Sequence, residues 1–119
     1  MDIYMDKYNL SKLNEYLIKT SIDRLYIITD EVVNRLYMDY LKSFIGDIDQ
    51  YVYILPSGEE NKTIDNILSI YDDLIEKNID RKTLIVSFGG GVVGDVAGFV
   101  ASTYKRGLNY IQIPTTLLA

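Results

Sequence analysis

Four short apolar runs alternate with segments of helical periodicity, and this alternation constrains the fold more than any other feature of the sequence. The runs are rich in β-branched and aromatic residues and span 25–29, 51–55, 83–88 and 110–113. They show no regular alternation with polar residues, which favours strands covered on both faces, as in a parallel sheet. We therefore predict an α/β fold, a Rossmann-like parallel sheet with helices on both faces.

Three segments between and after these runs have the pattern of helices. Asp30 is placed to cap the first of them. The apolar stripes are formed by Val33, Leu36, Tyr37, Tyr40 and Leu41 in the first helix and by Ile64, Ile67, Leu68, Tyr71, Leu74 and Ile75 in the second. A third helix, made of small residues, is expected from about Val92 to Tyr104.

Composition excludes several classes of function. The chain has 119 residues, a length that predicts one domain, and it contains no histidine and no cysteine. A Ser-His-Asp triad, an imidazole metal ligand and a thiolate metal site are therefore excluded. The net charge is −5, so the chain lacks the excess of lysine and arginine that is typical of nucleic-acid-binding proteins.

No segment indicates a membrane or secretory protein. The longest uncharged run, residues 107–119, has 13 residues and is too short to span a bilayer. The first residues do not form a basic region followed by an apolar one, so no secretory signal is predicted. We expect a cytoplasmic protein with a small-molecule partner and neither a nucleic-acid nor a membrane partner.

Charge is distributed unevenly along the chain. Only Asp95, Lys105 and Arg106 are charged among the 37 residues after Lys82. Such a stretch is usually buried on several sides, and the sequence stops on Leu-Leu-Ala without a polar tail. We therefore expect residues 1–119 to be part of a longer protein whose continuation covers this region.

The strongest motif is a glycine loop after the third apolar run. Residues Gly89-Gly90-Gly91-Val92-Val93-Gly94 satisfy G-x-G-x-x-G between a strand and a helix. Such glycines let backbone N–H groups approach a diphosphate at the helix N-terminus. No acidic residue follows at the ribose-binding distance of an ordinary dinucleotide fingerprint. The structural alternative is a tight turn with close helix packing through Gly94, Ala97, Gly98 and Ala101.

Other polar residues near the predicted strand ends allow two interpretations each. Asp95 could interact with the helix dipole or bind a ribose or substrate hydroxyl beside the glycine loop. Ser57 to Glu60 has capping-box spacing, whereas Glu59 and Lys62 could bind a ribose and a phosphate. Thr115 and Thr116 could cap a helix or contact a ligand. Lys105-Arg106 could end the third helix, or Arg106 could bind an anion through its guanidinium fork.

Taken together, these motifs resemble the 3-dehydroquinate synthase family. The resemblance rests on PSGEENK, the glycine loop with Asp95, YKRG from Tyr104 to Gly107, and PTT from Pro114 to Thr116. It implies an NAD- and divalent-metal-dependent lyase of the shikimate pathway. Its substrate would be 3-deoxy-D-arabino-heptulosonate 7-phosphate and its products 3-dehydroquinate and phosphate. The covered part resembles the N-terminal, NAD-binding half of that fold.

The resemblance also implies roles for individual residues. The NAD site would draw on Asp30, Ser57, Gly58, Glu59, Glu60, Asn61, Lys62, Gly90, Gly91, Val92, Val93, Gly94, Asp95, Thr115 and Thr116. Glu59 and Lys62 would hold the adenosine end, and Asp95 the nicotinamide ribose. Arg106 would bind substrate, across a dimer interface.

Where the sequence departs from the family pattern, the expectations change. The family binds zinc or cobalt in a C-terminal helical domain through a glutamate and two histidines, and residues 1–119 contain no histidine. We therefore expect no metal ligand and no catalytic residue here. We expect the full-length enzyme to be a homodimer, and this chain alone to be inactive and to bind NAD weakly or not at all. The alternatives are a cyclase similar to 2-deoxy-scyllo-inosose synthase, which typically has Asn at the position of Asp95, and a standalone nucleotide-binding module.

Overall fold

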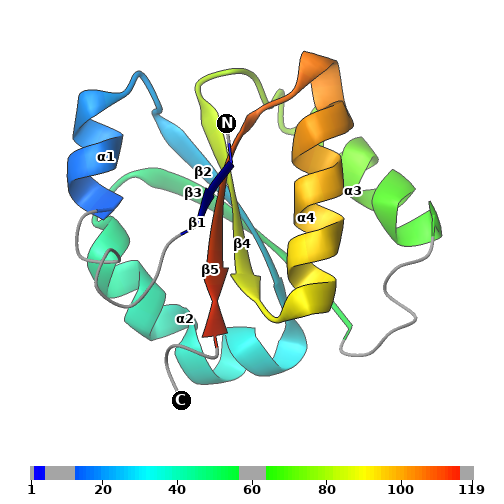
Figure 1. The fold of residues 1–119 in the computed structure, drawn as a ribbon, viewed down its shortest axis with the longest axis horizontal. Helices are drawn as coiled ribbons and strands as arrows, with labels where there is room; N and C mark the ends of the chain where they lie inside the picture. The colour runs from blue at the N-terminus through cyan, green and yellow to red at the C-terminus, as the bar shows by residue number, and fades with distance from the viewer. Residues whose placement is uncertain (1, 5–12, 57–63, 116–119) are drawn as a thin grey trace.

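The fold is built on a parallel sheet (Figure 1). The computed structural model describes residues 2–4, 13–56 and 64–115. Their strands are β1 (Asp2–Tyr4), β2 (Arg24–Asp30), β3 (Asp49–Leu55), β4 (Thr83–Gly89) and β5 (Asn109–Pro114). The order across the sheet is β1-β5-β4-β2-β3, and every neighbouring pair is parallel. The predicted α/β class and parallel sheet are confirmed.

Helices cover both faces of this sheet. They are α1 (Leu13–Lys19), α2 (Glu31–Ile45), α3 (Ile64–Glu76) and α4 (Gly91–Thr103), the last followed by a 3₁₀ turn, Tyr104–Arg106. Figure 1 shows α1 and α2 on one side of the strands and α3 and α4 on the other. The sequence analysis predicted neither β1 nor α1, because elements of three and seven residues are too short to show a clear period.

Two hydrophobic cores form because successive strand residues point to opposite faces. In β2, Leu25 and Ile27 belong to the core under α1 and α2, whereas Tyr26 and Ile28 belong to the core under α3 and α4. All seven residues of the central strand β4 are buried. The continuous apolar run at 83–88 therefore identified a strand covered on both sides.

The helices bury narrower stripes than the sequence suggested. In α3 the buried residues are Ile67, Ile70 and Leu74, while Leu68 and Ile75 are 50% and 61% exposed. Likewise, α2 buries Val33, Met38, Leu41 and Ile45 and leaves Leu36 and Tyr40 exposed. A helix lying on a sheet buries only the side chains that face the strands, so apolar residues on its flanks stay at the surface.

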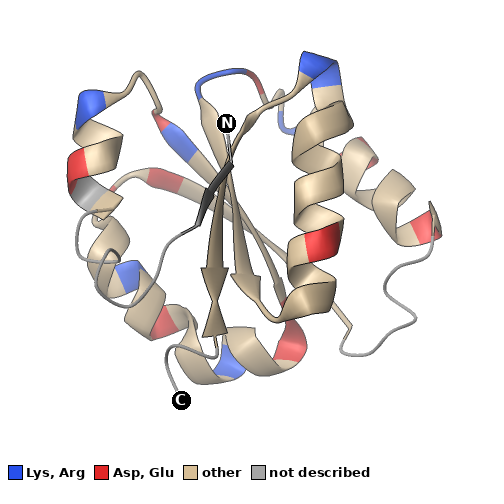
Figure 2. Ribbon diagram, in the orientation of Figure 1, with Lys and Arg blue, Asp and Glu red and all other residues tan. Residues whose placement is uncertain are grey.

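Charge is concentrated at particular places on this framework. Figure 2 shows Lys and Arg in the turn that leads into β4 and at the end of α4, which both lie at the amino edge of the sheet. Within the described ranges, no helix is long and apolar enough to cross a membrane.

Candidate functional site

The carboxyl ends of three adjacent strands bring the predicted ligand-binding residues to one edge. Strand β4 lies between β5 and β2, with Gly89 opposite Pro114 and Phe88 opposite Thr29. Thr115 therefore follows β5 beside the glycine loop, and Asp30 ends β2 on its other side. Ligands of open α/β sheets bind beyond this edge. A dinucleotide placed there would pass over three strands, or about 10 Å from β2 to β5.

The glycine loop presents unoccupied backbone donors at the centre of this edge. Helix α4 begins at Gly91, and its N-cap, Gly90, makes no side-chain capping bond. The first N–H groups of a helix have no partner within the helix and carry partial positive charge. A Cβ built on Gly90 or Gly91 would meet no atom of the described residues within 4 Å. This open space beside the donors is what the close approach of a phosphate requires.

Gly94 and Gly98 serve packing instead. A Cβ on Gly94 would lie 2.8 Å from Nε2 of Gln112, and one on Gly98 would lie 3.5 Å from the ring of Tyr110. The N–H of Gly94 already donates to the carbonyl oxygen of Gly90 at 3.0 Å. The two interpretations of the glycine motif thus apply to different glycines. Gly90 and Gly91 leave room for a ligand, while Gly94 and Gly98 let α4 approach β5.

A buried polar network, which sequence analysis missed, joins the first turns of α4 to the strands on which the helix packs. The hydroxyl of Tyr110 lies 3.0 Å from the carbonyl oxygen of Gly94 and 3.0 Å from Oγ of Ser87. One Tyr110 hydrogen can be donated to Gly94 while the Ser87 hydroxyl donates to Tyr110. The four-residue spacing of Gly94 and Gly98 was the sequence signal of close contact, but it did not identify the strand residues beneath.

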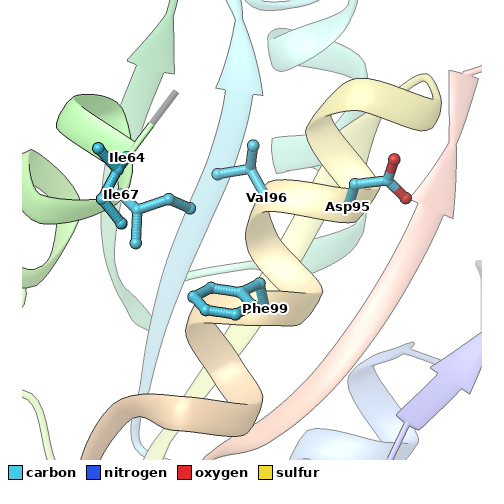
Figure 3. Close-up of a pocket in the computed structure, with 5 residues that line it drawn as sticks. All are labelled: Ile64, Ile67, Asp95, Val96 and Phe99. Carbon is cyan, nitrogen blue, oxygen red and sulfur yellow. The ribbon is translucent and has the colours of Figure 1, made fainter. Parts of the chain in front are cut away.

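Asp95 lies beside an apolar pocket between α3 and α4. The pocket has a volume of about 290 Å³ and is lined by Ile64, Ile67, Asp95, Val96 and Phe99. Figure 3 shows the carboxylate of Asp95 directed away from the isoleucines and from Phe99. Because α4 begins at Gly91, Asp95 is the fifth helical residue and not part of the first turn, where its sequence position had placed it. The helix-dipole explanation of this carboxylate is correspondingly weakened.

The remaining described residues of the predicted NAD site lie at the same edge. Asp30 caps α2 as predicted, because its Oδ1 accepts a hydrogen bond of 2.8 Å from the Val33 N–H. The second carboxylate oxygen of this half-buried residue makes no contact with a described residue. Thr115 is also half-buried. The hydroxyl of Thr29, which sequence analysis did not single out, donates to the Phe88 carbonyl at 2.6 Å and joins the ends of β2 and β4.

Arg106 lies at the other edge of the sheet. It follows α4, and β5 begins three residues later at Asn109, so the whole length of α4 separates it from the glycine loop. A helix of 13 residues is about 20 Å long. Within one chain, therefore, the structure does not bring Arg106 together with the predicted NAD site.

Some predicted residues cannot be located in this way. Ser57, Gly58, Glu59, Glu60, Asn61, Lys62 and Thr116 lie outside the described residues. Among the residues that are described, no three acidic side chains form a group that could hold a metal ion.

Comparison with known proteins gives a consistent family. The family model described as 3-dehydroquinate synthase N-terminal matches residues 52–119, more than half of the chain. A 3-dehydroquinate synthase of Streptococcus pyogenes serotype M3 is 43% identical over 118 residues, which are 99% of this chain and 33% of that protein. A bifunctional 3-dehydroquinate synthase/phosphatase of Fusobacterium nucleatum is 42% identical over 119 residues, with 99% and 18% coverage. The chain thus spans a third or less of the length of these relatives.

Solved structures agree on the fold. A crystal structure of 2-deoxy-scyllo-inosose synthase with carbaglucose-6-phosphate, NAD⁺ and Co²⁺ superimposes with a TM-score of 0.77 and 29% identity, covering 96% of this chain and 32% of that one. A 2-epi-5-epi-valiolone synthase from Streptomyces hygroscopicus, with NAD⁺ and Zn²⁺ bound, gives a TM-score of 0.74 at 22% identity, covering 97% and 32%. The second supports the fold alone.

Proposed function

The chain belongs to the 3-dehydroquinate synthase family, by the match to its N-terminal domain, and we propose that it forms the NAD-binding part of a 3-dehydroquinate synthase. The observation that carries this proposal is the open space at Gly90 and Gly91, which lies over the helix donors and between Asp30 and Thr115. No described residue lies within 4 Å of a Cβ built at either glycine, and the N–H groups of a helix start beside such a space suit a diphosphate.

Each part of NAD would meet a different group along the edge. The N–H groups of Gly91, Val92 and Val93 would donate to the diphosphate, and Asp95 would accept from the nicotinamide ribose. The free oxygen of Asp30 is placed for a hydroxyl of the adenosine ribose, next to the proposed contacts of Glu59 and Lys62. Gly94 would contribute by allowing α4 to approach β5. The cofactor, when bound, would supply a hydride acceptor for the carbon that bears a substrate hydroxyl, and that hydride would return to the substrate later in the reaction.

The substrate of the proposed enzyme is a sugar acid phosphate, 3-deoxy-D-arabino-heptulosonate 7-phosphate. Arg106 would bind it from a second copy of the chain, because in its own chain Arg106 is at the opposite edge from the glycine loop. A homodimer of the full-length enzyme is therefore part of the proposal. We also propose a cytoplasmic location, which suits an enzyme of the shikimate pathway.

A divalent metal does not fit the residues in hand. Hard or borderline cations need several carboxylate or imidazole ligands, and the described residues contain no such group. We propose that zinc or cobalt is bound by the helical C-terminal part of a full-length enzyme.

The alternative cyclase activity has less support. Identity to the two 3-dehydroquinate synthases is 42–43%, compared with 29% to the 2-deoxy-scyllo-inosose synthase. Asp95, where that enzyme typically has Asn, points the same way.

Two glycine substitutions test NAD binding at the loop. Gly91→Ala places a methyl group in the open space. Gly98→Ala, at another position of the same helix, places a methyl group at ordinary contact distance from Tyr110 of β5. Both replace a helical glycine, so both should keep or slightly raise stability. In an NMR titration with NAD, which detects weak binding, we expect shifts at the amides of residues 90–93. These shifts should vanish in Gly91→Ala and persist in Gly98→Ala.

The proposal fails if both alanine variants bind NAD alike, or if NAD at millimolar concentration shifts other amides of the chain and leaves those of residues 90–93 unshifted. Circular dichroism on each variant confirms that the fold is kept. Gly98→Ala controls for any general effect of an added methyl group on α4.

A further inference from the structure

A second pocket lies at the amino edge of the sheet, and two arginines line it. It has a volume of about 240 Å³ and is lined by Arg81, Arg106, Gly107, Leu108 and Asn109. Both arginine side chains are exposed. Neither makes an ion pair or hydrogen bond with another residue in the part of the chain that the structure describes. Arg81 comes from the turn before β4 and Arg106 from the turn after α4, so the fold joins them across 25 positions of sequence.

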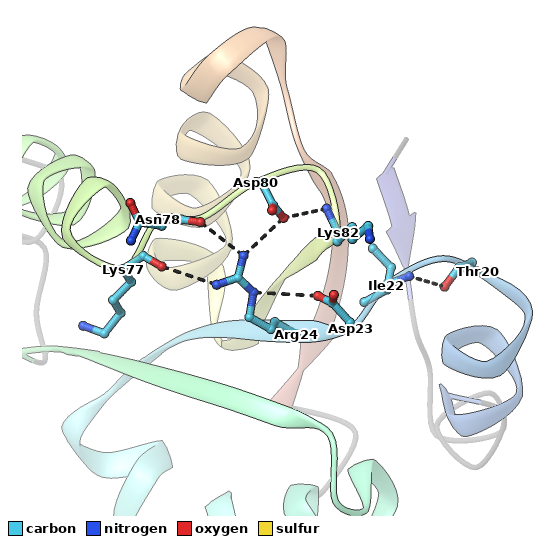
Figure 4. A network of polar contacts seen from close by, with 8 residues as sticks. All are labelled: Thr20, Ile22, Asp23, Arg24, Lys77, Asn78, Asp80 and Lys82. Atoms are coloured by element: carbon cyan, nitrogen blue, oxygen red, sulfur yellow. Dashed lines mark hydrogen bonds and ion pairs between the residues drawn. The ribbon is translucent and has the colours of Figure 1, made fainter.

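The turn that carries Arg81 is held on both sides by hydrogen bonds (Figure 4). Asp80 accepts from the Lys82 N–H at 2.9 Å and pairs with the Arg24 guanidinium at 3.2 Å. The Thr83 N–H donates to the Asp80 carbonyl at 3.0 Å. The residues next to Arg81 are thus fixed, while its own side chain is left to face the pocket.

The turn that carries Arg106 is fixed as well, in an unusual conformation. Lys105 and Arg106 have φ values of 45° and 75°, in the left-handed region that non-glycine residues seldom adopt. The Gly107 N–H donates to Tyr104 and the Leu108 N–H to Ala101, at 2.8 and 2.7 Å. The two cations of this turn then diverge, because Nζ of Lys105 donates to the Ile79 carbonyl at 3.4 Å and Arg106 lines the pocket.

The partial charge at the end of α4 explains why an anion at this edge would be bound by arginine side chains. The carboxyl-terminal end of α4 carries partial negative charge, so backbone groups there do not attract an anion. An anion can be bound at this edge only by cationic side chains. Two guanidinium forks can bind the oxygens of one phosphate or carboxylate with paired hydrogen bonds.

We propose that Arg81 acts with Arg106 as a second anion-binding residue, and that the two together hold a single phosphate or carboxylate group in this pocket. That this anion belongs to the sugar acid phosphate rests on the function proposed above. The pairing of the two arginines rests only on the geometry of the pocket.

Inorganic phosphate titrated into the full chain at constant ionic strength tests the pairing. We expect saturable shifts of the Gly107 and Asn109 amides, and an increase in Kd of about tenfold in Arg81→Gln and also in Arg106→Gln. Arg81→Lys keeps the charge and loses the fork, so its Kd should fall between those of the wild type and Arg81→Gln. Arg35→Gln, which removes an exposed arginine of α2, is the matched control and should bind phosphate as the wild type does. A parallel titration with malonate distinguishes a carboxylate from a phosphate as the preferred group.

Phosphate binding that is lost in Arg106→Gln and unchanged in Arg81→Gln would overturn the pairing, as would a wild type whose Gly107 and Asn109 amides do not respond to either anion. NAD titrations of the same samples, read at residues 90–93, report separately on the proposed function. A wild type in which NAD shifts other amides and not those of residues 90–93 would contradict that function and leave the arginine pair standing.

Discussion

The two edges of the sheet are both suited to anions, but they achieve this in opposite ways. At the carboxyl edge the donors are backbone N–H groups at the start of α4, beside two glycines that leave space. At the amino edge the donors are the side chains of Arg81 and Arg106, beside the end of the same helix. The difference follows from the direction of the helix dipole, which favours anions at one end and has to be overcome at the other.

The edges also differ in what holds them together. Arg24 at the amino edge contacts four groups: the carboxylates of Asp23 and Asp80 and the carbonyls of Lys77 and Asn78. Among the described residues, fewer side-chain bonds are found at the carboxyl edge, chiefly those of Thr29 and Asp30. Charged side chains therefore hold the amino edge together, whereas the described part of the carboxyl edge leaves space beside backbone N–H groups.

The largest change in stability is expected from a substitution at the amino edge. Arg24→Ala should lower the free energy of unfolding by about 2 kcal/mol, because two carbonyls and Asp80 lose a charged donor that is only 20% exposed. Urea denaturation measures the change. Arg35→Ala, at an exposed position, should stay within about 0.5 kcal/mol of the wild type. Equal stability of the two variants would mean that strand packing alone holds this edge.

A smaller effect is expected at the carboxyl edge. Thr29→Val removes the buried hydroxyl that joins β2 to β4 and should cost about 1 kcal/mol. The matched control lies at the other end of β4, where the hydroxyl of buried Thr83 has no partner among the described residues. Thr83→Val should be neutral or stabilising. If both substitutions cost the same, side-chain shape and not the Thr29 hydrogen bond decides the effect.

The smallest expected effect depends on pH. Burial opposes ionisation of Asp73, but hydrogen bonds from Lys77 and Tyr26 outweigh it and lower the pKa of this carboxyl below 3.8. Because the folded pKa is lowered, the stabilisation is complete above the ordinary pKa and is lost as the pH falls through the lower value. Asp73→Asn should therefore cost about 0.5 kcal/mol at pH 7, and this cost should decrease as the pH falls through the lowered pKa of Asp73.

Thermal unfolding between pH 2 and pH 7 measures this dependence. Asp72→Asn changes an exposed carboxylate of the same helix and is the control. A constant difference between Asp73→Asn and the wild type at all pH values would show that the charge of Asp73 does not stabilise the fold.

Local sequence patterns predicted much of the fold. The strands at β2 to β5 were found because runs of β-branched and aromatic residues favour strands, although only Leu55 is buried in the edge strand β3. The Asp30 cap was found because an N-cap bond joins residues three positions apart. The position of the glycine loop at a helix start was also predicted from a local pattern, the G-x-G-x-x-G motif between a strand and a helix. The short elements β1 and α1 gave no such signal.

Roles that depend on distant neighbours could not be predicted. Gly91 and Gly94 are glycines of the same motif, and only the position of Gln112 shows that the first is open and the second packed. The helix that carries Asp95 was predicted to begin at about Val92, one residue later than it does, and Asp95 was therefore placed in its first turn.

The sequence by itself determined the α/β class and the glycine-rich start of α4, because periodicity and helix capping act over a few residues. Only the tertiary structure decided that Asp30 and Thr115 flank the glycine loop, and that Arg106 lies with Arg81 at the opposite edge. The physical reason is that strand order is set by how crossovers pack on the sheet. That packing joins residues far apart in sequence, and no local pattern records it.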